Sequence, residues 1–271
     1  MIRAAALGGL TLLVGLTASC GTRAPSTPEA WIDSCFETLD GRGATARFKM
    51  WLTVQSSEAS MQLERRGEAS LRSAALFRIQ AESELALQLP GQDLQRGMTQ
   101  DLQVGDGEVR WLELARPDGR PPRVQELPLD GARPSEQAGE TESYPAPVDL
   151  DPIALLRLYT EHCSWTEEFA SEPRYVVLLG TDTPALRQEV ARLGSAFEPT
   201  RVRLTLDRDT ALPIDLSILE QGYASEGSAP TPGELSTLKI RYMAWTIGTV
   251  DALQFSYAPP TPTPSEESDG S

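Results

Sequence analysis

The feature that most constrains this chain is a two-residue alternation of apolar and polar side chains between Ala44 and Leu89. Apolar residues occupy every second position from Ala46 to Val54, and two further runs repeat the pattern up to Leu89. Because successive side chains of a strand point to opposite faces, each run predicts a strand with one buried and one solvated face. Three such strands in succession predict an antiparallel meander.

Further strands follow the meander. The turn at 105–107 separates two short apolar runs and predicts a hairpin, whereas 117–147 is rich in Gly, Pro and Glu and predicts a long loop, strand-like only at Val124–Leu129. The alternation then returns in five segments: 175–179, 202–206, 212–218, 238–244 and 253–257.

Two helices are predicted between these strands. The first has Ser26 as its N-cap and ends at Gly41; the second begins after Asp149 or Asp151 and ends near Cys163. About ten strands and two helices predict an α+β fold, in which a curved antiparallel sheet forms an open half-barrel and two helices cover its concave apolar face.

The N-terminus has the pattern of an export signal. Arg3 precedes the short apolar run Ala4–Leu16, and small residues follow up to Cys20. The run is too short to span a bilayer, so it predicts a cleaved signal peptide. The ending resembles a bacterial lipobox, in which Cys20 is lipidated; the alternative is an ordinary secretory signal cut near Ser19 or Gly21. With lipidation at Cys20, the composition predicts four segments: signal peptide 1–19, flexible tether 20–28, folded domain 29–258, and a disordered Pro-rich acidic tail 259–271.

The chain has three cysteines, Cys20, Cys35 and Cys163. An exported chain with three would keep an odd thiol in an oxidising compartment, and lipidation of Cys20 leaves an even pair. We therefore expect a disulfide between Cys35 and Cys163, worth about 4–5 kcal/mol if unstrained. The alternative is two buried free thiols.

Charge and residue counts exclude several functions. A formal charge of −15 without a basic run argues against nucleic-acid binding, and it predicts repulsion from an anionic leaflet, so that attachment depends on the lipid. A single histidine and no C-x-x-C motif argue against a metal site, and no cofactor is predicted. His162 and Cys163 are adjacent and diverge on a helix, and Glu82 and Glu84 share the polar face of a strand. We predict no catalytic residues.

Three segments, in order, carry a resemblance to a known family. They are the strand–turn–strand 67–79 beginning Gly-Glu-Ala-Ser-Leu-Arg, the hairpin Asp-Gly-Glu-Val-Arg-Trp at 106–111, and Phe-Ser-Tyr-Ala-Pro-Pro at 255–260. Over residues 30–260 the chain resembles the LolA/LolB-like lipoprotein-carrier superfamily, in which an open half-barrel lidded by helices holds acyl chains. Carriers of this family often have Arg-Pro before the Phe strand, where this chain has Ser73-Ala74, and an Arg there bonds to the lid and helps to gate it.

The resemblance implies a non-enzymatic, monomeric envelope protein, lipid-anchored and facing the periplasm at the outer membrane, that binds a lipid or an acylated lipoprotein. The alternative is an anchored sensor or scaffold with a closed core and a protein partner. In the first case the apolar alternating positions line an acyl cavity: Phe48, Met50, Leu52, Leu63, Phe77, Ile79, Leu85, Leu155, Leu156, Tyr159, Leu204, Ile240 and Phe255.

Overall fold

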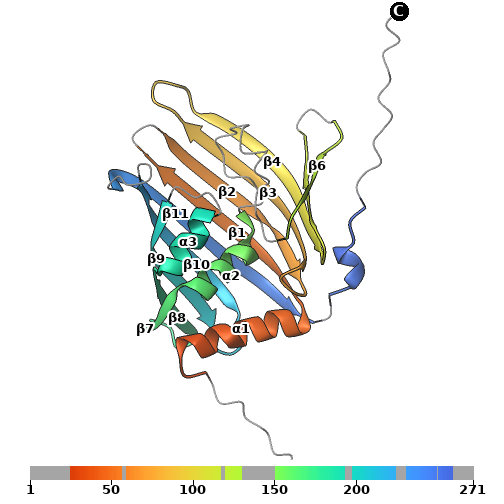
Figure 1. The fold of residues 1–271 in the computed structure, drawn as a ribbon, viewed down its shortest axis with the longest axis vertical. Helices are drawn as coiled ribbons and strands as arrows, with labels where there is room; N and C mark the ends of the chain where they lie inside the picture. Colours follow the sequence, from red (N-terminus) through yellow and green to blue (C-terminus); the bar gives the residue numbers. More distant parts are fainter. Residues whose placement is uncertain are drawn as a thin grey trace, which may run out of the picture.

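The computed structural model describes residues 25–56, 59–116, 120–129, 150–192, 197–223, 230–248 and 250–258. These residues form one open antiparallel sheet of eleven strands in the order β6-β5-β4-β3-β2-β1-β11-β10-β9-β8-β7, which confirms the predicted fold class (Figure 1). The strands are β1 Ala44–Gln55, β2 Ser60–Leu71, β3 Leu76–Gln88, β4 Gln95–Asp106, β5 Arg110–Leu114, β6 Arg123–Leu127, β7 Ser164–Glu168, β8 Tyr175–Thr181, β9 Phe197–Asp207, β10 Pro213–Tyr223 and β11 Pro230–Ile247.

The sheet consists of two meanders that meet at β1 and β11. The first runs from β1 to β6, the second runs from β7 to β11, and β11 then pairs with β1. At the centre, Met50 is paired with Arg65 of β2 on one side and with Ile240 of β11 on the other. The first and last strands of the domain therefore lie side by side in its middle.

Glycines permit close approaches within the curved sheet. A Cβ on Gly67 of β2 would lie 2.1 Å from the carbonyl oxygen of Gln80, and one on Gly105 of β4 would lie 2.4 Å from the ring of Phe77. A side chain at either position would therefore push neighbouring strands apart, which is a common reason for glycine inside a strand. The two glycines lie on the inner side of the curve, where the strands have least room.

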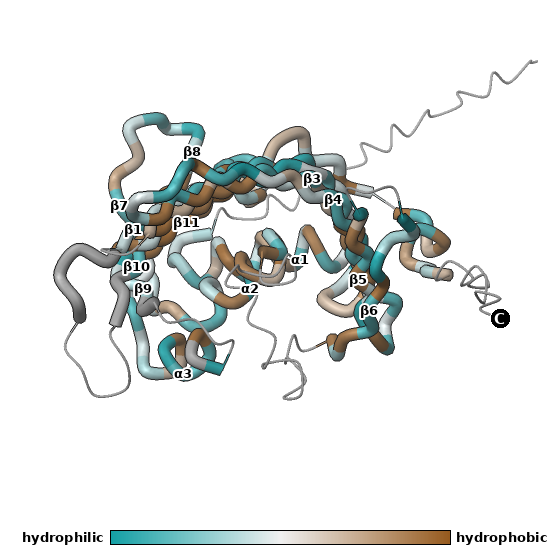
Figure 2. Tube along the Cα trace, turned by 90° about the horizontal axis from the view of Figure 1, so that it is seen from above, coloured by the Kyte–Doolittle hydropathy of each residue, from teal (hydrophilic) through white to brown (hydrophobic). Residues whose placement is uncertain are grey.

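Three α-helices lie inside the curve of the sheet, as Figure 2 shows from above. They are α1 Pro28–Arg42, α2 Pro152–His162 and α3 Pro184–Arg192. The predicted start of α2 is confirmed, because Asp151 is its N-cap and accepts hydrogen bonds from the amides of Ile153 and Ala154. No helix in the described ranges is long and apolar enough to cross a membrane.

The predicted ends of α1 were wrong by one or two residues. Thr27, not Ser26, is the N-cap, and its hydroxyl accepts from the amide of Ala30. The helix passes through Gly41 and ends at Gly43, whose φ of 74° is the left-handed conformation that favours glycine. Of two glycines two residues apart, the second therefore ends the helix.

Helix α3 was not predicted, although the sequence carried a signal for it. Thr183 precedes Pro184, and the Thr183 hydroxyl accepts a hydrogen bond from the amide of Leu186 at 3.1 Å. A threonine cap followed by proline at the first helical position is a standard helix start. The short strand β7 was also missed, because its burial does not alternate strictly.

The predicted last strand, 253–257, is wrong. Residues Ala252–Phe255 form a 3-10 helix, η3, capped by the side chain of Asp251, which accepts from the amide of Leu253. This helix packs against β3 and β4, and Figure 2 shows the segment that leads to the C-terminus on the opposite side of β4 and β5 from α1 and α2. The capping aspartate favours a helical turn more strongly than three alternating apolar residues favour a strand.

Candidate functional site

The concave face of the sheet and the helices that cover it share one apolar core. The predicted cavity residues other than Phe255 all belong to it, and most are almost completely buried: the exposed fraction is 0–1% for Met50, Ile240 and Leu156. Leu85 of β3 and Leu155 of α2 are only partly buried at its margin. The sequence pattern thus identified residues that are close in space, drawn from both meanders and from α2.

Within the part of the chain that the structure describes, this core is closed. The side chain of Leu156 in α2 is fully buried, as are those of Leu39 in α1 and Leu186 in α3, so the helices fill the concavity. A surface hollow of about 410 Å³ lies elsewhere, where α1 ends near the β2–β3 turn. Its lining residues are Asp40, Gly41, Arg42, Gly43, Arg72, Gly248 and Val250. An acyl chain would therefore have to displace a helix to reach the concave face.

Phe255 does not belong to this site. It is buried, with 2% of its surface exposed, but it lies in η3 and outside the main core cluster. The neighbouring Tyr257 donates a hydrogen bond to Glu113 of β5 at 2.7 Å and packs against Trp111. The end of the domain therefore seals the outer face of β3–β5, and the assignment of Phe255 to the cavity is corrected.

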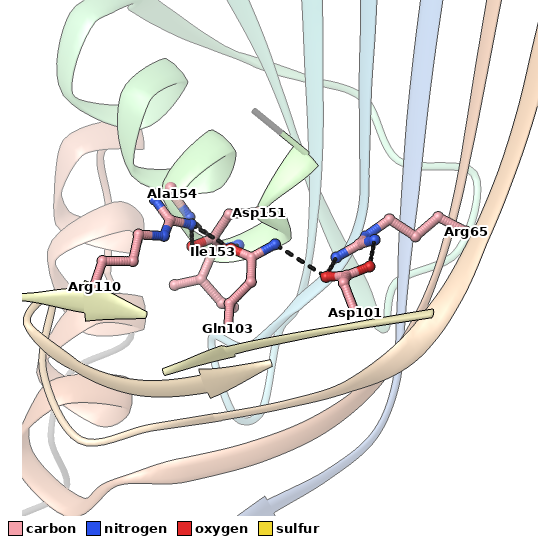
Figure 3. A network of polar contacts seen from close by, with 7 residues as sticks. All are labelled: Arg65, Asp101, Gln103, Arg110, Asp151, Ile153 and Ala154. Carbon is pink, nitrogen blue, oxygen red and sulfur yellow. Dashed lines mark hydrogen bonds and ion pairs between the residues drawn. The ribbon is translucent and has the colours of Figure 1, made fainter. Parts of the chain in front are cut away.

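A buried polar network crosses the concave face, as Figure 3 shows. Arg65 of β2 has no exposed surface and forms a two-pronged ion pair with Asp101 of β4, at 2.5 and 2.8 Å. The same guanidinium donates to the hydroxyl of Ser83 at 3.1 Å. A charged pair this deeply buried depends on both partners, since either one alone would be an uncompensated charge in an apolar surrounding.

The network continues from the sheet to helix α2. Gln103 donates to Asp101 at 3.2 Å, and its own oxygen accepts from Arg110 of β5 at 2.6 Å. Arg110 also donates to the carboxylate of Asp151 at 3.0 Å, and both side chains are 5% exposed. Asp151 thus caps α2 with one oxygen and binds the sheet with the other, and we refer to the Arg110–Asp151 pair as the latch.

This network was not predicted from the sequence, because only the apolar members of the alternation were assigned to the concave face. Arg65 occupies an inward position, two residues after Leu63 in the same alternation. Asp101 and Gln103 alternate in the same way on β4. If the two-residue alternation of β2 is extended to Arg65, it places a cation on the buried face. A buried cation requires a carboxylate nearby, so the alternation was the signal for the pair.

A tryptophan and two tyrosines make further polar bonds between α2 and the sheet, and the first is the bond from the indole of Trp165 in β7 to the carbonyl oxygen of Thr160 at 3.2 Å. The hydroxyl of Tyr242 on β11 donates to the carbonyl oxygen of Pro152 at 2.7 Å, and that of Tyr159 in α2 donates to Glu220 of β10 at 2.9 Å. Burial raises the pKa of Glu220 above its usual value, although the hydrogen bond from Tyr159 opposes this effect. Polar bonds therefore hold α2 to the sheet near both of its ends.

The predicted disulfide does not form. Cys35 and Cys163 are both free, and burial raises the pKa of each thiol to about 12. Cys35 lies in α1 near Arg157, in the middle of α2, whereas Cys163 caps the far end of α2 next to Gly180 of β8. The structure therefore has two free thiols, of which Cys35 is buried and Cys163 is half-buried at the margin of the core.

The acidic pair considered for catalysis lies away from the core. Glu84 is exposed, and Glu82 accepts a hydrogen bond from Arg66 at 2.9 Å on the outer face. Among the described residues no group of three His, Cys, Asp or Glu side chains is placed to hold a metal ion. Cys20, the signal peptide, most of the tether and the tail lie outside the described residues.

No protein-family model matches this sequence, and no curated protein matches it. Similar solved structures include LprF from Mycobacterium bovis, at 12% identity and a TM-score of 0.38, covering 89% of this chain and 99% of LprF. A LolA superfamily protein from Nitrosomonas europaea is 12% identical with a TM-score of 0.31, covering 86% of this chain and 99% of its own. An outer membrane lipoprotein-sorting protein domain from Vibrio parahaemolyticus is 12% identical with a TM-score of 0.33, covering 83% and 93%.

The proteins that the sequence motifs resemble are thus among the similar solved structures. Identities of 12% and TM-scores below 0.5 leave the function of this chain to be argued from its own geometry. That geometry has two parts, an apolar concave face and a helix fastened over it by polar bonds.

Proposed function

We propose that this chain is a lipid-anchored protein of the bacterial envelope that binds the acyl chain of a lipid or lipoprotein between the concave face and α2. The observation that carries the proposal is the way in which α2 is fastened. It covers apolar residues of both meanders, and the latch and the two tyrosine bonds hold its ends to the sheet.

An acyl chain inserted beneath α2 would have to compensate for the polar bonds and the apolar contacts that the helix makes with the sheet. A hydrogen bond within a protein contributes a net 0.5–1.5 kcal/mol or so, because water replaces it on opening. Each methylene removed from water contributes about 0.8 kcal/mol, so an acyl chain offsets the loss of several such bonds. The binding requires no bond chemistry, and we propose no catalytic step.

The anchor is proposed on the sequence alone. Cys20 would carry the lipid, residues 20–28 would tether the domain 29–258, and residues 259–271 would follow as a tail. After a high-salt wash, which weakens electrostatic contacts between the domain and the bilayer, Cys20→Ser in the full chain should move the protein from the membrane fraction to the soluble fraction of the envelope. Membrane association of this variant that is unchanged after the wash would refute lipidation.

Acyl binding is tested by titrating the full chain with a fluorescent fatty acid. Leu155 of α2 is partly buried against the core, whereas the adjacent Ala154 is exposed. Leu155→Glu should weaken binding about 10–100-fold, the equivalent of the 1.5–3 kcal/mol contributed by a buried leucine, and Ala154→Glu should leave it unchanged. Equal thermal melting of the two variants would show that both fold.

The closed core favours a second candidate. If α2 never leaves the sheet, the concave face is ordinary packing and the protein is an anchored scaffold or sensor with a protein partner. In that case the fluorescent fatty acid would bind neither to the unaltered chain nor to either variant.

A further inference from the structure

Cations that are scattered in the sequence lie together on the outer face of four neighbouring strands. On β9, β10, β11 and β1 the side chains between the buried positions point outward, and six of them are basic. We refer to them as the basic face: Arg47, Lys49, Arg201, Arg203, Lys239 and Arg241. They include both lysines of a chain whose formal charge is −15.

Strand pairing brings these cations together. Lys49 of β1 is directly opposite Arg241 of β11, and Trp51 is opposite Lys239. Lys239 is in turn opposite Ser217 of β10, whose partner on β9 is Arg203. Because neighbouring strands lie about 4.8 Å apart, this row extends roughly 15 Å across the sheet.

The basic face keeps an excess of positive charge after its ion pairs are counted. Lys49 pairs with Glu64 at 2.7 Å, Arg241 with Asp215 at 2.9 Å, and Arg203 with Glu168 at 3.4 Å. Asp207, on the same face of β9, is bound by Arg174. Within the described ranges, no ion pair involves Arg47, Arg201 or Lys239. Arg47 is directly opposite Glu68 of β2, whereas Lys239 is opposite Trp51 and Ser217, and Arg201 is opposite Leu219.

Apolar side chains are exposed between the cations. The exposed fractions are 39% for Met243, 38% for Leu219 and 39% for Leu235, and all three point outward from the central strands. The half-buried ring of Trp51 lies 5.0 Å from the ammonium of Lys49. They are spread over the face as single side chains, an arrangement that suits a lipid surface better than a peptide, which needs a groove.

We propose that the basic face lies on the surface of an anionic phospholipid bilayer, with the cations at the headgroups and the exposed apolar side chains inserted between them. Net repulsion of the acidic chain does not prevent this, because charges on the far side of the domain are screened beyond about 8–10 Å. Strand pairing thus brings cations onto one surface although the sequence has no basic run. The inference does not depend on what the concave face binds.

The proposed anchor would favour the same contact. Seven residues separate Cys20 from Pro28, the start of α1, and the eight steps along the chain span at most about 29 Å when fully extended. A domain held this close meets the bilayer at a high effective concentration, so a weak contact suffices. The test must therefore exclude the anchor.

The experiment uses the full chain with Cys20→Ser and vesicles of phosphatidylcholine, alone or with 30% phosphatidylglycerol. Co-sedimentation at low and high salt is compared for this protein, for Arg47→Gln with Lys239→Gln, and for a control. The control, Arg96→Gln with Arg116→Gln, removes the same charge from exposed positions outside the basic face.

We expect binding to the anionic vesicles that high salt weakens, and a loss of about 30-fold in the Arg47/Lys239 variant, from about 1 kcal/mol per cation. The Arg96/Arg116 control should bind within twofold of its parent. Equal binding to vesicles with and without phosphatidylglycerol would overturn the proposal. An equal loss of binding in the Arg47/Lys239 variant and in the Arg96/Arg116 control would also overturn it. So would retention of the parent on poly-glutamate beads without vesicle binding, which would indicate an acidic protein partner. None of these results depends on fatty-acid binding, so the two proposals can fail separately.

Discussion

Asp151→Asn should free helix α2 without removing its cap. Asparagine can still accept hydrogen bonds from the amides of Ile153 and Ala154, as the aspartate does at 2.8 and 2.9 Å. What is lost is the charge opposite Arg110, at a nitrogen–oxygen distance of 3.0 Å with both side chains 5% exposed. The substitution therefore separates the latch from the helix cap.

The size of the effect follows from the burial of the pair. Removing one partner of a buried ion pair costs about 3–5 kcal/mol. Arg110 retains its 2.6 Å bond to Gln103 and its position 5.2 Å from the ring of Phe77, so we take the lower value. About 3 kcal/mol corresponds to a roughly 100-fold increase in the fraction of molecules in which α2 is open.

Amide hydrogen exchange measures that fraction directly. If α2 is a lid, exchange at 154–162 should accelerate about 100-fold in Asp151→Asn while the amides of β1 and β2 keep their protection. A control, Asp251→Asn, makes the same change at the cap of η3 and should leave α2 unaffected. Equal acceleration in β1 would mean that α2 is an inseparable part of the core, and no acceleration would mean that the latch does not hold it.

Three further predictions concern the core. Asp101→Leu should destabilise the fold by about 3–5 kcal/mol in urea unfolding, and adding Arg65→Met should recover most of the loss; independent additive losses would contradict a coupled pair. Burial raises the pKa of Glu220, so the folded state favours the protonated carboxyl. The free energy of unfolding should therefore fall as the pH rises from 4.5, the ordinary pKa of the group, through the raised pKa. In Glu220→Gln the melting temperature should fall less over the same pH range. A pH profile identical to that of the unaltered chain would refute the role of Glu220. Cys35 and Cys163, each with a pKa of about 12, should react slowly with a thiol reagent at pH 8 and give two thiols on unfolding; zero thiols would indicate a disulfide.

The parts of the fold that depend on local alternation were predictable. The period of two located β1, β2 and β3 and assigned most of their side chains to the correct face. Helix α2 was equally clear, because Asp151 and a following proline form a strong start signal. In each case the sequence signal lies within a single segment of the chain.

Features that depend on pairing between distant strands were not predictable in the same way. The Arg65–Asp101 pair joins residues 36 positions apart, and the basic face joins β1 to β9–β11 through the register. The two-residue alternation alone places Arg65 on the buried face. Its partner Asp101 is known only when the pairing register of β2, β3 and β4 is known. The failure of the Cys35–Cys163 prediction has the same origin, because counting cysteines carries no information about distance.

Native mass spectrometry of the full chain purified from membranes shows whether the concave face holds an acyl chain. We expect a bound lipid in addition to any covalent one, lost when Leu155→Glu is introduced and kept in Ala154→Glu. Protein of unliganded mass, together with no binding of the fluorescent fatty acid, would contradict it.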